Sequence, residues 1–125
     1  MPSPSTVQDR YPYQNQLHWS KSERLIARRA FDTALKRELH EIIQQSKQKA
    51  SQIREPADVW ELERYLTRRR KDIDQKYQFR NSRLKDDLGR LLYANRLLEE
   101  GLQGLSKDKV EKIRSFAQFL AEEVA

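Results

Sequence analysis

The chain is 125 residues long, with 37% hydrophobic and 35% charged residues, so it has the length of one domain and a composition on the polar side of globular proteins. Its 25 basic and 19 acidic residues give a net charge of +6, and residues 19–54 hold most of this excess, with nine basic and four acidic side chains. The absence of cysteine excludes disulfides and thiolate metal ligands, and no stretch approaches the roughly 20 apolar residues of a membrane span. We therefore expect a soluble, cytoplasmic protein without integral membrane contact.

Residues 1–18 are predicted to form a disordered or loosely docked tail. They carry three of the four prolines and many small polar side chains, and they lack the apolar core of a signal peptide. The remaining residues, 19–125, are expected to form a single helical domain, with a stalk over residues 19–80 and a head over residues 81–125.

A long helix is predicted over residues 21–54. Ser20, followed three residues later by Glu23, has the sequence pattern of a capping box that starts a helix. No glycine or proline interrupts the 34 residues that follow, which at about 1.5 Å each make a rod on the order of 50 Å long. Apolar side chains recur along this segment at spacings of three and four, as on one face of a helix.

A rod of this length protrudes from any compact chain of 125 residues, because the radius of gyration of such a chain is roughly 14 Å. Its apolar stripe therefore needs cover, both from the next helix folding back and from a second copy of the chain. We expect a homodimer whose stalk interface contains Phe31, Leu35, Leu39, Ile42, Leu62 and Leu66.

A second helix is predicted after Pro56, which ends the first one. Asp58, followed three residues later by Glu61, resembles the capping box of this helix. Its apolar side chains recur at helical spacing and consist of Val59, Leu62, Leu66, Ile73 and Tyr77.

Two further helices are predicted in the C-terminal part of the chain. The first runs from Leu84 to Leu98, contains Gly89, and is closed by Gly101 in the left-handed conformation. Ser106 is predicted to cap the last helix. No strand pattern occurs, so the expected fold class is all-α, with paired long helices in a dimeric stalk and a small helical head.

Trp60 is predicted to point away from the core of its helix. At 100° per residue, the apolar stripe of the second helix centres roughly 125° away from Trp60, and charged side chains surround it, namely Glu63, Arg64, Arg70, Lys71 and Asp74. Trp60 can pack on a neighbouring helix or on the dimer mate, or it can act as a binding anchor, since Trp and Arg carry much of the energy of protein interfaces. The sequence leaves both interpretations open.

The chain is not expected to bind specific nucleic acid. Arg68, Arg69 and Arg70 fan around their helix at intervals of about 100°, so they form no single stripe that could follow a phosphate backbone. The basic residues between positions 21 and 37 allow at most a weak contact with an anionic surface.

Catalysis is also disfavoured. A nucleophile needs an adjacent base, but the only two histidines, His18 and His40, lie in no recognisable motif, and Asp72 and Asp74 point about 200° apart on their helix. No metal-ligand spacing is present. We predict a non-enzymatic binding module without a cofactor.

The segment VWELERYLTRRRKDIDQKYQFRNS, residues 59–82, resembles the central segment of the fluorescence recovery protein family of cyanobacteria. The spacing of Trp60 and Tyr77 and the run DIDQKY at residues 72–77 carry this resemblance, which extends from Trp19 to about Phe116. It implies an all-α homodimer with long helices, a small head and no cofactor. It also implies a regulator that binds the C-terminal domain of the photoactivated orange carotenoid protein, accelerates its return to the dark orange form and restores phycobilisome fluorescence at the cytoplasmic face of thylakoids.

By the same resemblance, the functional tryptophan of the family falls on Trp60 and its essential arginine on Arg70, with Glu63 and Arg64 beside them in the partner contact. The family commonly has a histidine and an acidic or amide residue where this chain has Glu63 and Arg64, and an apolar, phenylalanine-containing run where this chain has residues 83–88. The alternative is a divergent homologue that keeps the dimer and serves as a helical interaction module for another partner, as in an organism without orange carotenoid protein.

Overall fold

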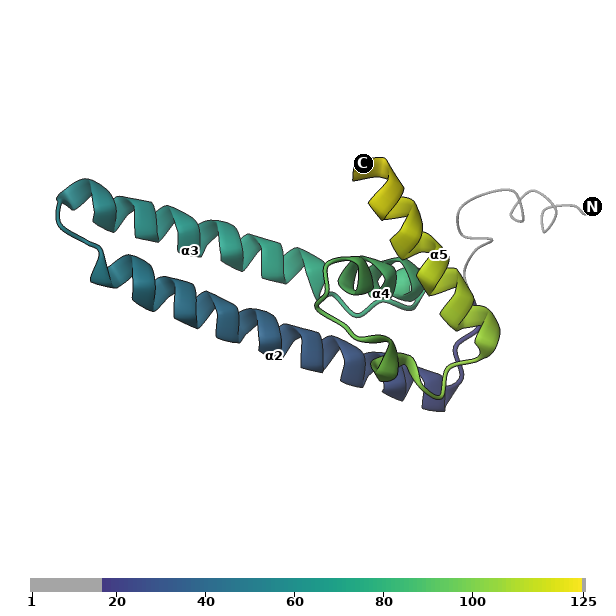
Figure 1. Ribbon diagram of the computed structural model, residues 1–125. Helices are drawn as coiled ribbons and strands as arrows, with labels where there is room; N and C mark the ends of the chain where they lie inside the picture. The colour runs from purple at the N-terminus through teal and green to yellow at the C-terminus, as the bar shows by residue number, and fades with distance from the viewer. Residues whose placement is uncertain (1–16, 125) are drawn as a thin grey trace, which may run out of the picture.

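The structure is a computed structural model that describes residues 17–124. Among these residues the fold is all-α, as predicted from the sequence, with four α-helices and two short 3₁₀ helices. Figure 1 shows the two long helices, α2 (Lys21–Ser51) and α3 (Pro56–Lys76), side by side as an antiparallel hairpin. The short helices α4 (Leu84–Tyr93) and α5 (Lys107–Val124) gather at one end and form the head.

The predicted N-terminal tail lies outside the described residues except for Leu17 and His18. Leu17 packs against the buried core, and His18 is exposed. Within residues 17–124, no helix combines the length and the apolar character that crossing a membrane requires.

The long helix α2 begins at the predicted capping box. The hydroxyl of Ser20 accepts a hydrogen bond from the amide of Glu23, and the carboxylate of Glu23 accepts one from the amide of Ser20, both at 3.1 Å. The helix ends at Ser51 rather than at residue 54. The carboxylate of Asp58 accepts hydrogen bonds from the amides of Arg54 and Glu55, which draws these residues away from the helix.

The second long helix begins three residues earlier than the predicted N-cap Asp58 implies. Glu55 is its N-cap residue, Pro56 occupies the first helical position and Asp58 the third. Proline suits the first position because an amide there has no partner within the helix. The predicted capping box of Asp58 and Glu61 is therefore wrong, since the carboxylate of Asp58 reaches back to Glu55.

The helix α4 is shorter than predicted, because it ends at Tyr93 instead of near Leu98. Asn95 adopts a positive φ of 60°, which a short polar side chain tolerates, and the amides of Arg96 and Leu97 both donate to the carbonyl of Leu91. Gly101 is not the left-handed cap that we predicted. It lies in a 3₁₀ helix, η3 (Glu99–Leu102). A second 3₁₀ helix, η2 (Asn81–Arg83), precedes α4.

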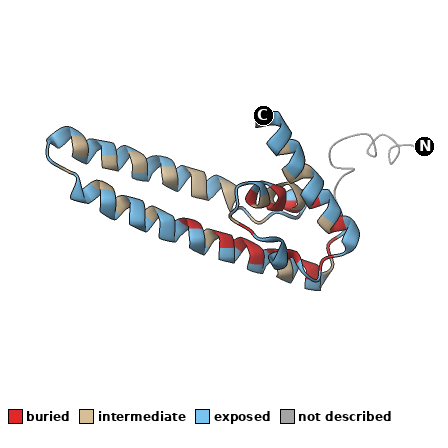
Figure 2. Ribbon diagram, in the orientation of Figure 1, coloured by how far each residue is buried: buried red, intermediate tan, exposed pale blue. Residues whose placement is uncertain are grey.

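The buried core lies at the head end of the hairpin. Figure 2 shows that buried residues gather on the N-terminal half of α2 and in the head, whereas the far part of the hairpin contains only half-buried and exposed residues. The apolar core consists of Trp19, Ala27, Ala30, Phe31, Ala34, Leu84, Leu88, Leu91, Leu97, Leu102, Leu105 and Ile113. No residue of α3 is buried, so the hairpin beyond Glu38 has no core of its own.

Glu23 joins the starts of α2 and α5. Besides the amide of Ser20, its carboxylate accepts hydrogen bonds from the amide of Ser106 and from Nζ of Lys109, both at 3.0 Å. Ser106 in turn caps α5, as predicted, by accepting from the amide of Lys109. Burial raises the pKa of Glu23, but the hydrogen bonds from Ser20, Lys109 and Ser106 outweigh it and lower the pKa to about 2. This buried carboxylate fixes the head on α2.

Candidate protein-interaction site

Trp60 lies on the outer face of α3, which points away from α2. Its side chain is 59% exposed. Leu62, Tyr65 and Arg69 are half-buried on the side that faces α2, and at 100° per residue the centre of these three lies about 170° from Trp60. The structure therefore presents Trp60 to solvent within the protomer, near the far end of the hairpin.

The stripe that α3 turns toward α2 differs from the predicted apolar stripe. Leu62 and Tyr77 are half-buried as expected, but Val59 and Leu66 are 43% and 42% exposed. The polar residue Arg69 takes a contact position, because a buried carboxylate of α2 lies opposite it. The contact face is rotated by roughly 60° from the purely apolar stripe.

That carboxylate belongs to Glu38, which is fully buried. It accepts hydrogen bonds from Arg69 at 2.6 Å, from Lys76 at 2.6 Å and from the hydroxyl of Tyr77 at 2.7 Å. Burial raises the pKa of Glu38, but the hydrogen bonds from Lys76, Tyr77 and Arg69 outweigh it and hold the pKa below its ordinary value. Burial and the neighbouring carboxylate raise the pKa of the Tyr77 hydroxyl above its usual range.

The Glu38 cluster is a positioning element that sequence reasoning missed. It sets the rotation of α3 on α2 and so decides which side chains of α3 face solvent. The sequence contained one signal for it, since Glu38 stands seven residues after Phe31 on the same face of α2. An acid at an apolar position of a stripe indicates a buried partner, because an unpaired charge there would be costly.

The charged side chains on the outer face of α3 form no ion pair within the described part of the chain. The ion pairs of α3 involve Arg69, Asp72 and Lys76, which lie on the inner side. Glu63 accepts a hydrogen bond from the hydroxyl of Thr67 at 2.9 Å. The outer charges without an ion-pair partner are Glu61, Glu63, Arg64, Arg68, Arg70, Lys71 and Asp74. Such a frame around an exposed tryptophan leaves the charges free to pair with a second protein.

Arg70 lies ten residues from Trp60, which corresponds to about 15 Å along the helix axis. The two residues therefore mark two points of an extended surface rather than one pocket. Glu63 and Arg64 lie within one turn of Trp60, at the third and fourth positions after it. The structure thus brings Trp60, Glu63 and Arg64 together and places Arg70 farther along the same helix, toward the head.

A second surface is apolar. Leu39, Ile43, Val59 and Leu66 are each between 42% and 50% exposed. Each side chain lies roughly 60° to 100° around the axis of its own helix from the side that contacts the other helix. Because the two helices are right-handed and antiparallel, all four side chains lie on the same side of the hairpin. We call these four residues the apolar face.

The residues predicted for a dimer interface divide into three groups. Leu39 and Leu66 lie on the apolar face. The half-buried residues Leu35, Ile42 and Leu62 lie beside it, at the contact between the helices. Phe31 is unavailable for such an interface, so this part of the prediction is wrong. Phe31 is buried in the core that α2 shares with the head, and its ring meets those of Tyr77 and Phe79 edge-on at 6.2 Å and 5.4 Å between centroids.

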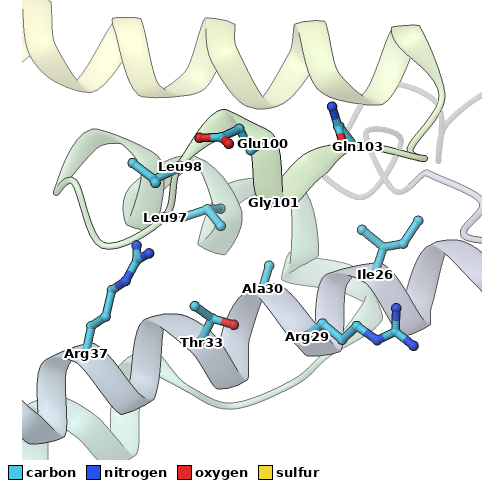
Figure 3. Close-up of a pocket in the computed structure, with 10 residues that line it drawn as sticks. All are labelled: Ile26, Arg29, Ala30, Thr33, Arg37, Leu97, Leu98, Glu100, Gly101 and Gln103. Carbon is cyan, nitrogen blue, oxygen red and sulfur yellow. The ribbon is translucent and has the colours of Figure 1, made fainter.

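A groove of about 470 Å³ lies between α2 and the segment that follows α4 (Figure 3). Ala30 and Thr33 of α2 lie opposite Leu97, and Arg37 donates a hydrogen bond to the carbonyl of Arg96. The residues that line this groove include the Thr33 hydroxyl but no histidine. Among residues 17–124, no group of histidine, aspartate and glutamate side chains is arranged to hold a metal ion.

These features define an all-α protein with a helical hairpin, a small head and an exposed tryptophan on the outer face of α3. The family model of the photoprotection regulator fluorescence recovery protein matches residues 19–117. The chain therefore belongs to the fluorescence recovery protein family, as the resemblance of residues 59–82 predicted.

The chain is also similar to individual members of this family. It is 34% identical over 100 residues to the fluorescence recovery protein of Synechocystis sp., which covers 80% of this chain and 92% of that protein. The solved structure of the Fremyella diplosiphon protein matches with a TM-score of 0.77 at 36% identity and covers 81% of this chain and 99% of that one. The Synechocystis structure matches with the same TM-score and coverage at 34% identity.

Proposed function

We propose that this chain binds the C-terminal domain of photoactivated orange carotenoid protein, accelerates its return to the dark orange form and so restores phycobilisome fluorescence. The observation that carries the proposal is the 59% exposed side chain of Trp60 on the outer face of α3, with Arg70 on the same helix, in a member of this family. Tryptophan and arginine are the side chains that most often dominate interface energies.

This function needs no catalytic residue. A binding protein accelerates a conformational relaxation when it binds the transition state of that relaxation more tightly than the activated starting state. A long, rigid helix that presents two anchors about 15 Å apart suits this task, because it can hold two parts of a partner in a defined relative position. We place the protein in the cytoplasm, at the cytoplasmic face of thylakoids.

The proposed active species is a homodimer joined through the apolar face. Trp60 lies about 100° around α3 from Val59, so a second copy that covers the apolar face leaves the outer face of α3 open to the carotenoid protein.

The recovery assay tests this proposal. Photoactivated orange carotenoid protein is mixed with the chain, and the red-to-orange conversion is followed in the dark. We expect faster recovery with the wild-type chain, and loss of most of the acceleration for Trp60→Leu and Arg70→Leu at unchanged helical content. Phe119→Leu and Arg24→Leu are matched controls, since both replace an exposed side chain of similar chemistry on another helix. Recovery no faster than without the chain would refute the proposal.

A second candidate function is a dimeric helical interaction module for a different partner. Arg64 favours it, because this cation stands one turn from Trp60 at a position where the family commonly has an acidic or amide side chain. The cheapest test is whether the source organism encodes an orange carotenoid protein. Its absence, together with a failed recovery assay, would favour this second function.

A further inference from the structure

Three cations form a ridge on α3 beside Trp60. Arg64, Arg68 and Lys71 follow one another at spacings of four and three, so they lie on one side of the helix, between about 20° and 80° around the axis from Trp60. All three are exposed. None has an ion pair within the described residues, whose ion pairs on this helix all involve its inner side. We call these three residues the basic ridge.

The basic ridge lies on the side of Trp60 that is turned away from the apolar face. Arg70 lies on the opposite side of Trp60, toward Val59 and Leu66. A second copy that covers the apolar face would therefore leave the ridge in solvent.

Acidic side chains do not neutralise the ridge from within α3. The acids nearest to it, Glu61, Asp72 and Asp74, stand three or four residues from one of its cations, but none of them forms an ion pair with the ridge among the described residues. Asp72 is already paired with Arg69 and Lys76. The ridge therefore carries an excess of unpaired positive charge.

The ridge leads to a second groove, in the head. Gln75 takes the next four-residue step after Lys71 and lines a groove of about 380 Å³ between the end of α3, α4 and α5. Leu91, Ala94 and Leu120 give this groove an apolar lining.

The same groove has cationic side chains around it. Arg83 and Arg90 belong to its lining, and Asp87 is its only acidic lining residue. The Asp87 carboxylate is mostly buried, 3.8 Å from Arg83, and burial raises its pKa above the ordinary value. The groove thus combines apolar contact with positive charge, and it continues the charge of the ridge.

We propose that the basic ridge and the head groove form one track that receives an acidic, amphipathic segment of the partner protein. Carboxylates of the segment would pair with Arg64, Arg68 and Lys71, and its apolar side chains would enter the head groove. A polypeptide fits the track better than a nucleic acid, because a phosphate backbone has no apolar side chains that could fill the groove. The inference rests on the proposed function for the identity of the partner, the orange carotenoid protein. Trp60 would contact the same partner outside the track, as a separate anchor.

The experiment compares Lys71→Glu with the matched control Lys47→Glu, which reverses another exposed lysine in the middle of a long helix. The probe is a fluorescein-labelled peptide of alternating glutamate and leucine, titrated at low and at high salt. We expect Lys71→Glu to weaken binding about fivefold or more and to flatten its salt dependence, and Lys47→Glu to stay within about twofold of the wild type. Equal effects of the two variants, or no binding by the wild type at low salt, would overturn the track. A DNA duplex that binds more tightly than the peptide, and is weakened by Lys71→Glu, would also overturn it.

The recovery assay separates this inference from the proposed function. If Lys47→Glu accelerates recovery and Lys71→Glu does not, the result supports both the track and the proposed function. Equal acceleration by the two variants overturns the track and leaves the proposed function intact. If no version accelerates recovery while the peptide still distinguishes Lys71→Glu from Lys47→Glu, the proposed function fails, and the track is assigned to an acidic segment of another protein.

Discussion

The buried carboxylate of Glu38 accepts a hydrogen bond from the hydroxyl of Tyr77 at 2.7 Å, at the point where the helical hairpin meets the head. Tyr77 is the C-cap residue of α3, and its ring also packs edge-on against Phe31 of the core. The ring of Tyr77 lies against the core that α2 shares with the head, so one side chain joins this apolar contact to a polar contact with Glu38 of α2. This arrangement couples the position of the head to the rotation of α3, and thus to the direction in which Trp60 points.

Removing the carboxylate of Glu38 should lower the free energy of unfolding more than removing the hydroxyl of Tyr77. Glu38→Ala removes the buried acceptor that Arg69 and Lys76 share and leaves them only Asp72, and we expect a loss of roughly 2–4 kcal/mol. Tyr77→Phe keeps the ring and removes one hydrogen bond to a charged acceptor, for a loss of about 1–2 kcal/mol. Urea unfolding followed by circular dichroism measures both. A smaller loss for Glu38→Ala than for Tyr77→Phe would contradict the central role of the carboxylate.

Glu23 should make the protein sensitive to acid. Its pKa is about 2 in the folded chain, below the ordinary value, so the unfolded state binds the proton first as the pH falls. The stability that the carboxylate contributes is complete above the ordinary pKa and is lost between about pH 4.5 and pH 2. The lowered pKa of Glu38 acts in the same direction.

The measurement is the urea midpoint across this pH interval, for the wild type and for Glu23→Gln. We expect the wild type to lose stability with acid and the variant to show a shallower slope, because its amide does not titrate. Glu122→Gln, which changes an exposed acid on α5, should keep the wild-type slope. Identical slopes for all three proteins would argue against a stabilising role of Glu23.

Gly89 is expected to resist substitution, because α4 and α5 approach each other closely there. A Cβ atom at this position would lie 2.8 Å from Cδ2 of Phe116 and 3.2 Å from the carbonyl oxygen of Ile113. Alanine improves helix propensity by about 1 kcal/mol, but overpacking costs typically 1–3 kcal/mol, and the backbone of Ile113 moves only with α5. We predict that Gly89→Ala lowers the free energy of unfolding by about 1 kcal/mol.

Thermal unfolding tests this prediction against Gly101→Ala. A Cβ atom at Gly101 would meet only the flexible end of Leu97, at 2.9 Å, so this control should lose less stability. A melting temperature of Gly89→Ala at or above that of the wild type would show that α5 shifts freely on α4.

Local signals in the sequence predicted the helices well. The capping residues Ser20 and Ser106 each act through neighbours within a few positions, so their effect can be read from the sequence directly. Pro56 marks the break between the long helices, but it begins the second helix instead of ending the first, which stops at Ser51. The end of α4 was missed because two residues compete for the left-handed position there. Asn95 takes it, whereas Gly101, the more common choice for such a cap, lies in the following 3₁₀ helix.

Long-range contacts could not be predicted in the same way. Glu23 pairs with Ser106 and Lys109, more than 80 positions away, and no periodic pattern marks these partners. The outward direction of Trp60 followed from helical geometry alone, since the charged residues around it tolerate solvent. The exposure of Val59 and Leu66 could not be predicted from helical geometry, because it depends on the buried carboxylate of Glu38 opposite α3.

The apolar face should hold two copies of the chain together. Its four residues remain between 42% and 50% exposed, and the hairpin beyond Glu38 has no buried residue, so a second copy would supply the missing cover. We expect the wild type to sediment with twice the chain mass of 15.0 kDa at micromolar concentration. Leu66→Glu places a charge in this face and should give a monomer that keeps its helical content.

Leu98→Glu is the matched control, because Leu98 is 49% exposed but lies in the head. We expect this variant to remain a dimer. Since the basic ridge lies on the other side of α3, the Leu66→Glu monomer should still bind the acidic peptide. A dimer that survives Leu66→Glu but is lost with Leu98→Glu would place the contact at the head, and the exposed leucines of the hairpin would then need another partner.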